Sequence, residues 1–290
     1  MPDDSTNRMA TLRGISLLIS GVTLFGAMDG LGKLLVGEYP VVQVIWARYA
    51  FAVPVVLMMT TPRAWPKLLR CERPWLQAGR GLLPLLASAT VVVGLAFMPL
   101  ADATAITFAS PLFVVILSIP LLRERISVHS WIGVGCGFGG ILVIVRPGAG
   151  TIAAAALLPL GTALFFALYQ VLTRLVSRRD EPIVTLAWTI SIGLLTTTPA
   201  LAFLWQQPAS GEDWALMGLS GVLFGLGQFL LIRAFSIVPA SVLAPFTYAQ
   251  IVAAVVFGVL VFGDVPDRWA FLGTTLVILS GIYLLRRQPV

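Results

Sequence analysis

Charged side chains are scarce in this sequence: Asp, Glu, Lys and Arg together make up 11% of the 290 residues. A water-soluble domain carries about twice that share, and so few charges leave the surface of such a domain without a polar cover. The chain also has only one histidine and two cysteines. Cys71 lies in a basic loop and Cys136 in a glycine-rich apolar block, so they predict neither a disulfide framework nor a metal site. We expect a membrane protein without metal or cofactor.

Apolar residues, by contrast, make up 58% of the chain. They form blocks of about 18–25 residues, each long enough to cross the ~30 Å hydrocarbon core of a bilayer as a helix. The blocks are continuously apolar and do not alternate, which argues against a transmembrane β-barrel. We therefore predict an all-α integral membrane protein with ten transmembrane helices. Their expected ranges are 14–36, 41–60, 76–98, 101–122, 131–146, 153–176, 183–204, 214–235, 240–262 and 268–286.

The net charge of +6 does not indicate a nucleic-acid surface, because the basic residues stand at the ends of the apolar blocks. Most of them fall on the side that holds the amino terminus, as do the four in the loop 61–75. Cytoplasmic loops of membrane proteins carry such an excess of Lys and Arg. We expect a multi-pass protein of a bacterial-type inner (cytoplasmic) membrane with both termini in the cytoplasm. Its partners are then the lipid bilayer and a small solute, with no nucleic acid.

The two halves of the chain resemble each other at a spacing of about 140 residues. The string YPVVQVIWAR (39–48) matches EPIVTLAWTI (181–190), and LLRERISVHSWIG (121–133) matches VFGDVPDRWAFLG (261–273). Five helices per half is an odd number, so the second copy has to insert upside down, as in many transporters. We expect two inverted five-helix repeats, 1–148 and 149–290. A duplicated scaffold with no moving parts is the alternative.

Several of these features together resemble a known family. Ten helices in a five-plus-five repeat, the arginine of WAR (46–48) and the acid of LLRER (121–125) are similar to the drug/metabolite transporter superfamily, EamA type. The pattern D-x-x-x-K, formed by Asp29 and Lys33, resembles the branch that contains riboflavin importers and S-adenosylmethionine importers. The resemblance implies a central cavity between the halves, alternating access and small organic metabolites as substrates.

An acid and a base interrupt the first apolar block, FGAMDGLGKLL (25–35). Asp29 and Lys33 are four residues apart and share one helix face, and Arg48 on the next helix lies at a similar depth. An unpaired charge in the bilayer costs roughly 2.5–3.5 kcal/mol, so these groups should face protein or a wet cavity. Either Asp29 bridges Arg48 and locks two helices, or the three charges form a positive centre for an electron-rich substrate. Ile190 stands where the second half would repeat Arg48, so the site is chemically asymmetric.

Aromatic and amide side chains within the predicted spans are candidates for the wall of a substrate pocket. They offer flat faces and a few polar groups to orient an organic molecule. Amides inside a span are costly without a partner, although helix-to-helix hydrogen bonds would also satisfy them, and Trp and Tyr also occur in interfacial belts. The candidates are Trp46, Tyr49, Phe165, Tyr169, Gln170, Trp188, Gln228, Tyr248 and Gln250.

Acids at helix ends and unusual backbone residues complete the candidates. The resemblance implies that Glu124 and Asp264, which end corresponding helices, are gate-side or packing acids paired with nearby arginines; a solvated loop acid is the alternative. Glycines in GVGCGFGG (133–140) predict close helix packing, because no strand precedes them as a dinucleotide site requires. Prolines interrupt the fourth and ninth predicted helices and indicate hinges or static kinks. These are Pro111, Pro120, Pro239 and Pro245.

The function predicted from these features is secondary transport of a small organic metabolite by alternating access. A membrane enzyme would need a nucleophile with a base or paired acids deep in the bilayer, and the only histidine, His129, falls in a predicted loop. A scaffold would need an interaction domain. A pocket of aromatic and amide groups suits a flat heterocycle with a polyol tail, so riboflavin uptake is the leading hypothesis. Export of amino acids or related metabolites and uptake of S-adenosylmethionine are the alternatives.

Overall fold

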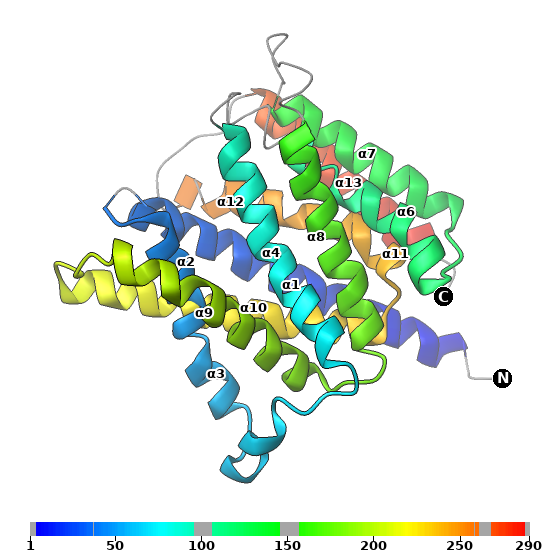
Figure 1. Cartoon of the computed structure of the whole chain (residues 1–290). Helices are drawn as coiled ribbons and strands as arrows, with labels where there is room; N and C mark the ends of the chain where they lie inside the picture. The colour runs from blue at the N-terminus through cyan, green and yellow to red at the C-terminus, as the bar shows by residue number, and fades with distance from the viewer. Residues whose placement is uncertain are drawn as a thin grey trace.

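Helices form all the regular structure in the part of the chain that the computed structural model describes (Figure 1). That part comprises residues 4–36, 38–95, 106–145, 157–257, 259–260 and 268–287. The α-helices are α1 (Asp4–Val36), α2 (Val41–Ala50), α3 (Val53–Met58), α4 (Pro74–Leu95), α6 (Ser110–Leu122), α7 (Val128–Val145), α8 (Leu157–Val176), α9 (Pro182–Leu204), α10 (Gly211–Ile237), α11 (Ala240–Leu243), α12 (Ala249–Phe257) and α13 (Arg268–Arg287). Two short 3-10 helices are η1 (Pro62–Lys67) and η2 (Ala244–Tyr248).

Five of the described helical segments are long and apolar enough to cross a membrane: Met9–Gly32, Val41–Met58, Leu157–Val176, Pro182–Leu204 and Gly211–Ile237. Shorter apolar helices accompany them, among them Ser110–Leu122 and Phe271–Leu284. Large apolar side chains cover the outside; Phe203, for example, is 90% exposed. Such a surface is stable only against lipid, so the chain is a multi-pass membrane protein.

Two predicted helices are not continuous. The range 41–60 divides into α2 and α3 across Phe51 and Ala52, because Pro54 has no N–H with which to bond the carbonyl of the preceding turn. The range 240–262 divides into α11, η2 and α12, and Pro245 lies in η2 where the helix tightens. The first five residues of the range 101–122 lie outside the described residues.

The core lies where α1, α6, α8 and α10 meet. Leu18, Val115, Val171 and Phe235 are among its fully buried residues, one from each of these helices. Helix α1 packs against α10 and α12, and α8 packs against α4 and α6. Because these helices come from both halves of the sequence, the two halves form one continuous interior.

Glycines allow α7 and α13 to approach closely. A Cβ atom added to Gly140 would lie 2.8 Å from the carbonyl oxygen of Gly273 and 3.0 Å from a methyl group of Val277. Gly133 contacts Leu284 in the same seam, and Gly137 lies against the ring of Tyr248. The structure therefore has the close helix packing that these glycines predict.

Adding a side chain to this seam is expected to destabilise the protein. A Gly140→Val substitution should lower the free energy of unfolding by about 1–3 kcal/mol, because α7 would have to move away from a backbone oxygen. Gly139 is the matched control, since no atom of the described residues would lie within 4 Å of its Cβ, and Gly139→Val should change stability by less than about 0.5 kcal/mol. Thermal unfolding in detergent measures both. Equal melting temperatures for the two variants would contradict the packing argument.

Candidate substrate-binding cavity

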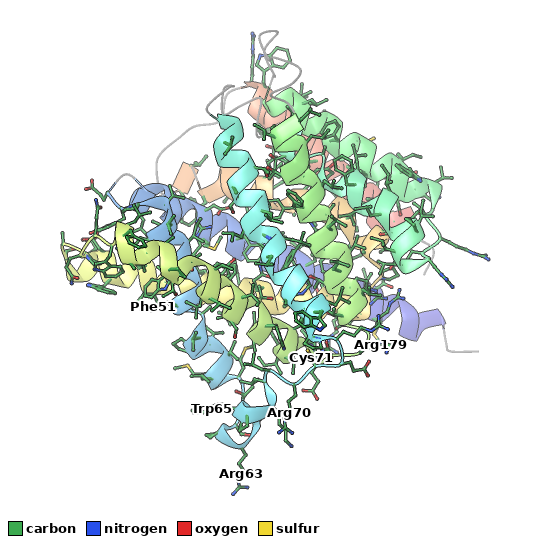
Figure 2. The ribbon with its side chains drawn as sticks, viewed as in Figure 1. Phe51, Arg63, Trp65, Arg70, Cys71 and Arg179 are labelled. Atoms are coloured by element: carbon green, nitrogen blue, oxygen red, sulfur yellow. The ribbon has the colours of Figure 1, made fainter. Side chains whose placement is uncertain are left out.

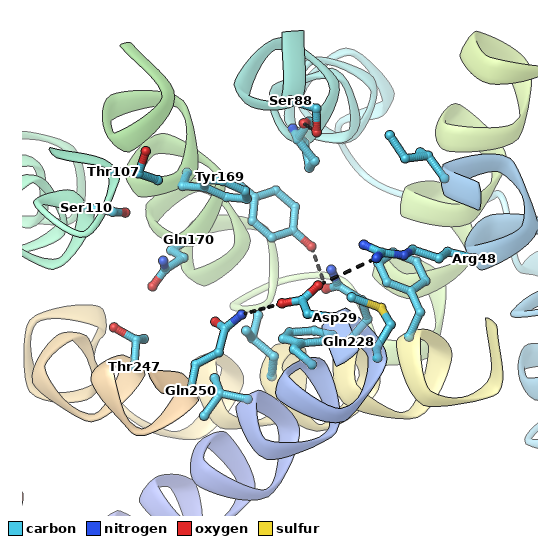
Figure 3. Close-up of a pocket in the computed structure, with 18 of the residues that line it drawn as sticks. Asp29, Arg48, Ser88, Thr107, Ser110, Tyr169, Gln170, Gln228, Thr247 and Gln250 are labelled. Carbon is cyan, nitrogen blue, oxygen red and sulfur yellow. Dashed lines mark hydrogen bonds and ion pairs between the residues drawn. The ribbon is translucent and has the colours of Figure 1, made fainter. Parts of the chain in front are cut away.

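A cavity of about 410 Å³ lies between helices of the two halves, within the usual range for small-molecule sites. Its walls come from α1, α2, α4, α6, α8, α10, η2 and α12. Apolar side chains form much of the lining, and Phe166 takes the place expected for Phe165, which packs into the core instead. The polar side chains of the lining are Asp29, Arg48, Tyr49, Ser88, Thr107, Ser110, Tyr169, Gln170, Gln228, Thr247 and Gln250 (Figure 3).

Asp29 and Arg48 meet in the wall of the cavity. Arg48 Nη2 lies 3.6 Å from Asp29 Oδ1, and Gln250 Nε2 donates to Asp29 Oδ2 at 3.2 Å. A Cβ atom at Gly32 would come within 2.5 Å of Arg48 Nη2, so only a glycine there lets the guanidinium lie against α1. The Asp29 side chain is 49% exposed and that of Arg48 22%. The pair thus bridges α1 and α2 and still presents polar surface to the cavity; the side chain of Lys33 lies outside the described residues.

Aromatic groups flank this pair. The Tyr169 hydroxyl donates to Gln228 Oε1 at 2.7 Å and so joins α8 to α10 across the cavity (Figure 3). The rings of Tyr49 and Phe224 meet edge to face with centroids 5.0 Å apart. Gly193 on α9 leaves room for the Tyr49 ring, which would collide with any Cβ there. Flat apolar faces and fixed polar groups therefore line the same space.

Three buried polar atoms of the lining have no hydrogen-bond partner among the described residues. Arg48 Nε belongs to the residue that pairs with Asp29, and the other two are Ser110 Oγ and Gln170 Oε1. The hydroxyls of Ser88, Tyr169 and Thr247 in the same lining each have a hydrogen-bond partner, which Ser110 Oγ and Gln170 Oε1 lack. An unsatisfied buried polar group costs about 1–3 kcal/mol, so these two atoms are suited to a ligand.

A polar network next to the cavity centres on Arg80, which lies within the predicted span 76–98. Arg80 is 0% exposed, and its guanidinium lies 5.2 Å from the centre of the Tyr169 ring. Its hydrogen-bond acceptors are the carbonyl oxygen of Thr185 (2.8 Å) and the side chains of Thr189 (2.6 Å), Thr173 (3.2 Å) and Gln77 (3.3 Å). The network joins α4 to α8 and α9. The sequence feature that could have indicated this network was an arginine inside an apolar block.

Besides Phe165, three predicted pocket residues lie away from the cavity. Trp46 Nε1 donates to Thr198 Oγ1 at 3.2 Å, and Trp188 Nε1 donates to the carbonyl oxygen of Leu69 at 3.2 Å. Both indoles therefore bind polar groups on the outer faces of their helices, as interfacial tryptophans do. Tyr248 is 1% exposed and packs between α7 and α13. None of the three belongs to the cavity lining in this structure, because residue type does not decide which face of a helix lines a cavity.

Glu124 is neither a solvated loop acid nor paired with its neighbours Arg123 and Arg125. Its carboxylate caps the first turn of α11, accepting from the backbone N–H groups of Ala240 (3.2 Å) and Ser241 (3.0 Å) and from the Ser241 hydroxyl (2.8 Å). Arg174 and Arg178 each lie 3.7 Å from Glu124 Oε1. The acid therefore ties α6 to α8 and α11, which is a packing role. Asp264 lies outside the described residues, and His129 belongs to α7, with Nδ1 2.8 Å from the Tyr283 hydroxyl.

The sequence of this chain matches the model of the EamA-like transporter family twice, at residues 12–146 and 153–287. The chain belongs to the EamA-like transporter family. Known members related to this EamA-like chain include a riboflavin transporter of Vibrio cholerae, 30% identical over 84% of this chain and 83% of that protein. An S-adenosylmethionine uptake transporter of Rickettsia bellii is 26% identical over 94% and 93%. A pseudopaline exporter of Pseudomonas aeruginosa is 28% identical over 94% and 99%.

These relatives are named for the movement of small solutes; one of the three names specifies uptake and one specifies export. The EamA-like chain is accordingly a membrane transporter of a small metabolite rather than an enzyme. A solved crystal structure covers 96% of this chain and 98% of its own chain with a TM-score of 0.78. Its sequence identity is 19%, so this likeness concerns the fold alone.

Proposed function

We propose that this protein takes up riboflavin, or a similar uncharged aromatic metabolite, across the inner membrane by alternating access. The observation that carries the proposal is the lining of the cavity. Its described side chains include one acid and one base, and these pair with each other. Aromatic rings of Tyr49, Tyr169 and Phe224 supply flat faces. A neutral heterocycle fits such a site better than a sulfonium cation, which would compete with Arg48 for Asp29.

The packing of the helices supports two inverted repeats, 1–148 and 149–290. The observed helix contacts map onto one another when α1 is exchanged with α8, α2 with α9, α4 with α10 and α6 with α12. The contacts of α1 with α10 and α12 then correspond to the contacts of α8 with α4 and α6. The pairs α2–α9 and α7–α13 map onto themselves and lie about the proposed axis. If α2–α3 and α11–α12 each count as one crossing, the described helices are consistent with the ten crossings that we propose. Related halves that exchange conformations are the basis of alternating access.

The arrangement of basic residues supports an orientation with both termini in the cytoplasm. The amino-terminal end of α1 and the carboxy-terminal end of α13 lie on the same side of the molecule (Figure 1). Arg63, Arg70 and Cys71 lie together at one end of it, near Arg179 (Figure 2). A cluster of arginines at one end is what the cytoplasmic face of a membrane protein requires.

Labelling of Cys71 tests this orientation. In a Cys136→Ser variant, Cys71 is the only thiol of the chain, and a membrane-impermeant maleimide should label it only after the membrane is permeabilised. Partial burial raises the pKa of the Cys71 thiol, and the nearby Asp180 carboxylate adds to the rise. The thiolate fraction at neutral pH is therefore small, and labelling should become faster as the pH increases from 7 to 9. Labelling of Cys71 in intact spheroplasts would mean that the orientation is opposite to the one we propose.

Uptake of radiolabelled riboflavin into cells of a riboflavin-auxotrophic, transport-deficient bacterium tests the proposed function. Expression of this protein should restore growth at low vitamin concentration. A Tyr169→Phe variant should need about fivefold more riboflavin, because it loses one hydrogen bond in the cavity wall. Phe203→Leu, on the lipid-facing surface, serves as the control. Absence of uptake by a protein that is correctly inserted would end the riboflavin proposal.

Amino acids and related zwitterions form the second candidate class. Half of the Asp29 side chain remains exposed beside Arg48, and Arg48 Nε has no partner among the described residues. A zwitterion could bind both charges by inserting between them. Export of labelled amino acids from preloaded vesicles, without riboflavin uptake, would favour this class.

A further inference from the structure

We propose that the end of the cavity formed by Ser110 and Gln170 binds the hydroxyl groups of the substrate's polyol chain, while the flat ring system lies near Tyr49 and Phe224. This inference rests on the proposed transport of riboflavin and adds the orientation of the bound molecule. It also assigns a specificity-determining role to Ser110, which sequence reasoning did not single out.

Ser110 has no structural use for its hydroxyl. The side chain is 8% exposed, and its Oγ has no partner among the described residues. Ser118, in the same helix, instead donates its hydroxyl to the carbonyl oxygen of Val114 at 2.7 Å. Ser110 is the first residue of α6, and the N-cap position belongs to Ala109. Because no described contact of the fold uses this hydroxyl, the position of Ser110 in the cavity lining points to a ligand.

Gln170 supplies a second buried polar atom without a hydrogen-bond partner among the described residues. The atom is Oε1, and the residue lines the cavity. In Figure 3, Gln170 lies on the same side of the cavity as Ser110, Thr107 and Thr247, while Arg48 lies on the opposite side. Two unsatisfied polar atoms therefore occur at one end of the space, away from the ion pair.

The chemistry of this end selects an uncharged group that both donates and accepts. An amide oxygen accepts only, and a serine hydroxyl both donates and accepts. Asp29 and Arg48 are the only Asp, Glu, Lys or Arg residues in the described lining, so an ammonium or carboxylate at the Ser110 end would be buried without a counter-charge. A carboxylate or a carbonyl also cannot donate to Gln170 Oε1. Alcohol groups satisfy both atoms.

The opposite end suits a ring system. Tyr49 adjoins Arg48 in α2 and forms an edge-to-face pair with Phe224, and the Tyr169–Gln228 hydrogen bond holds a third ring of the lining in place. Stacking against fixed aromatic faces contributes affinity without fixing the identity of polar substituents. The ring end thus provides general affinity for flat heterocycles, whereas the Ser110 end distinguishes those that carry a hydroxylated chain.

Comparison of two flavins tests the inference. Riboflavin carries the polyol chain, and lumiflavin has a methyl group in its place, so binding of both to purified protein is measured by quenching of flavin fluorescence. Ser110→Ala and Gln170→Leu should each raise the Kd for riboflavin about fivefold and leave the Kd for lumiflavin within twofold of wild type. Ser118→Ala, in the same helix but outside the cavity lining, should change neither Kd.

The outcomes separate this inference from the proposed function. The two variants could weaken the binding of both flavins equally, or leave the binding of both unchanged, while wild-type protein still takes up riboflavin. In either case the assignment of the polyol end is wrong and the proposed function stands. If wild-type protein binds and transports neither flavin, the proposed function fails and the inference fails with it. Selective loss of riboflavin binding in both variants supports the orientation.

Discussion

Replacement of Arg80 by alanine is expected to lower the free energy of unfolding by about 3–5 kcal/mol, because it leaves a large void and removes the donors that hold three helices together. The guanidinium is fully buried and bonds to acceptors on α4, α8 and α9. Thermal unfolding in detergent measures the loss. Because Arg80 also supports the Tyr169 ring, the affinity for riboflavin should fall as well.

An Arg80→Lys substitution separates charge from geometry. Lysine retains the positive charge but lacks the planar fork that reaches Thr173 and Thr189 together. We expect the free energy of unfolding of Arg80→Lys to lie between that of wild type and that of Arg80→Ala. Arg63→Ala is the control, since Arg63 is exposed in η1 before α4. A melting temperature of Arg80→Ala equal to that of Arg63→Ala would mean that the buried network does not stabilise the fold.

Replacement of Glu124 by alanine is expected to lower the free energy of unfolding by about 2–4 kcal/mol. The substitution leaves the N–H groups of Ala240 and Ser241 without their acceptor and Arg174 without its counter-charge. The Glu124 side chain is only 7% exposed, so water cannot replace these contacts fully. The contribution of Arg178 is smaller because that residue is largely solvent-accessible.

Glu72 offers a matched comparison for Glu124. It also pairs with an arginine, Arg179, at 2.8 Å, but both side chains are more than half exposed. Glu72→Ala should therefore change stability by less than about 1 kcal/mol. Chemical unfolding of both variants gives the two free energies. A similar small loss for Glu124→Ala would show that capping of α11 does not stabilise the contact between α6, α8 and α11.

Much of the fold could be predicted from the sequence, because hydrocarbon places one dominant demand on a chain. Every lipid-facing backbone group must bond within its own segment, so apolar blocks become helices. The kink at Pro54 and the break at Pro245 follow from missing backbone donors, yet their exact consequences depend on neighbouring helices. The proximity of Asp29 and Arg48 was also predictable, since equal depth on adjacent helices leaves charged groups few other partners.

Which side chains face the cavity could not be predicted in the same way. Trp46 and Tyr49 are three residues apart on α2, but the first binds Thr198 and the second lines the cavity. The partners of Arg80 could not be read from the span 76–98 that contains it, because acceptors such as Thr173 and Thr185 lie about a hundred residues further along the chain. Ser110 gave no signal at all, since a serine at the start of a helix usually serves the helix itself.

The sequence by itself determined the membrane setting, the helical class, the family and the charged residues that have to be hidden from lipid. These properties depend on composition and on repeats, which are local or periodic features of the chain. Only the tertiary structure decided that Asp29, Tyr169, Gln228 and Gln250 share one cavity and that Trp46, Trp188 and Tyr248 do not. The reason is physical: a helix carries residues on all its faces, and the rotation that turns one face inward results from packing against helices distant in the sequence.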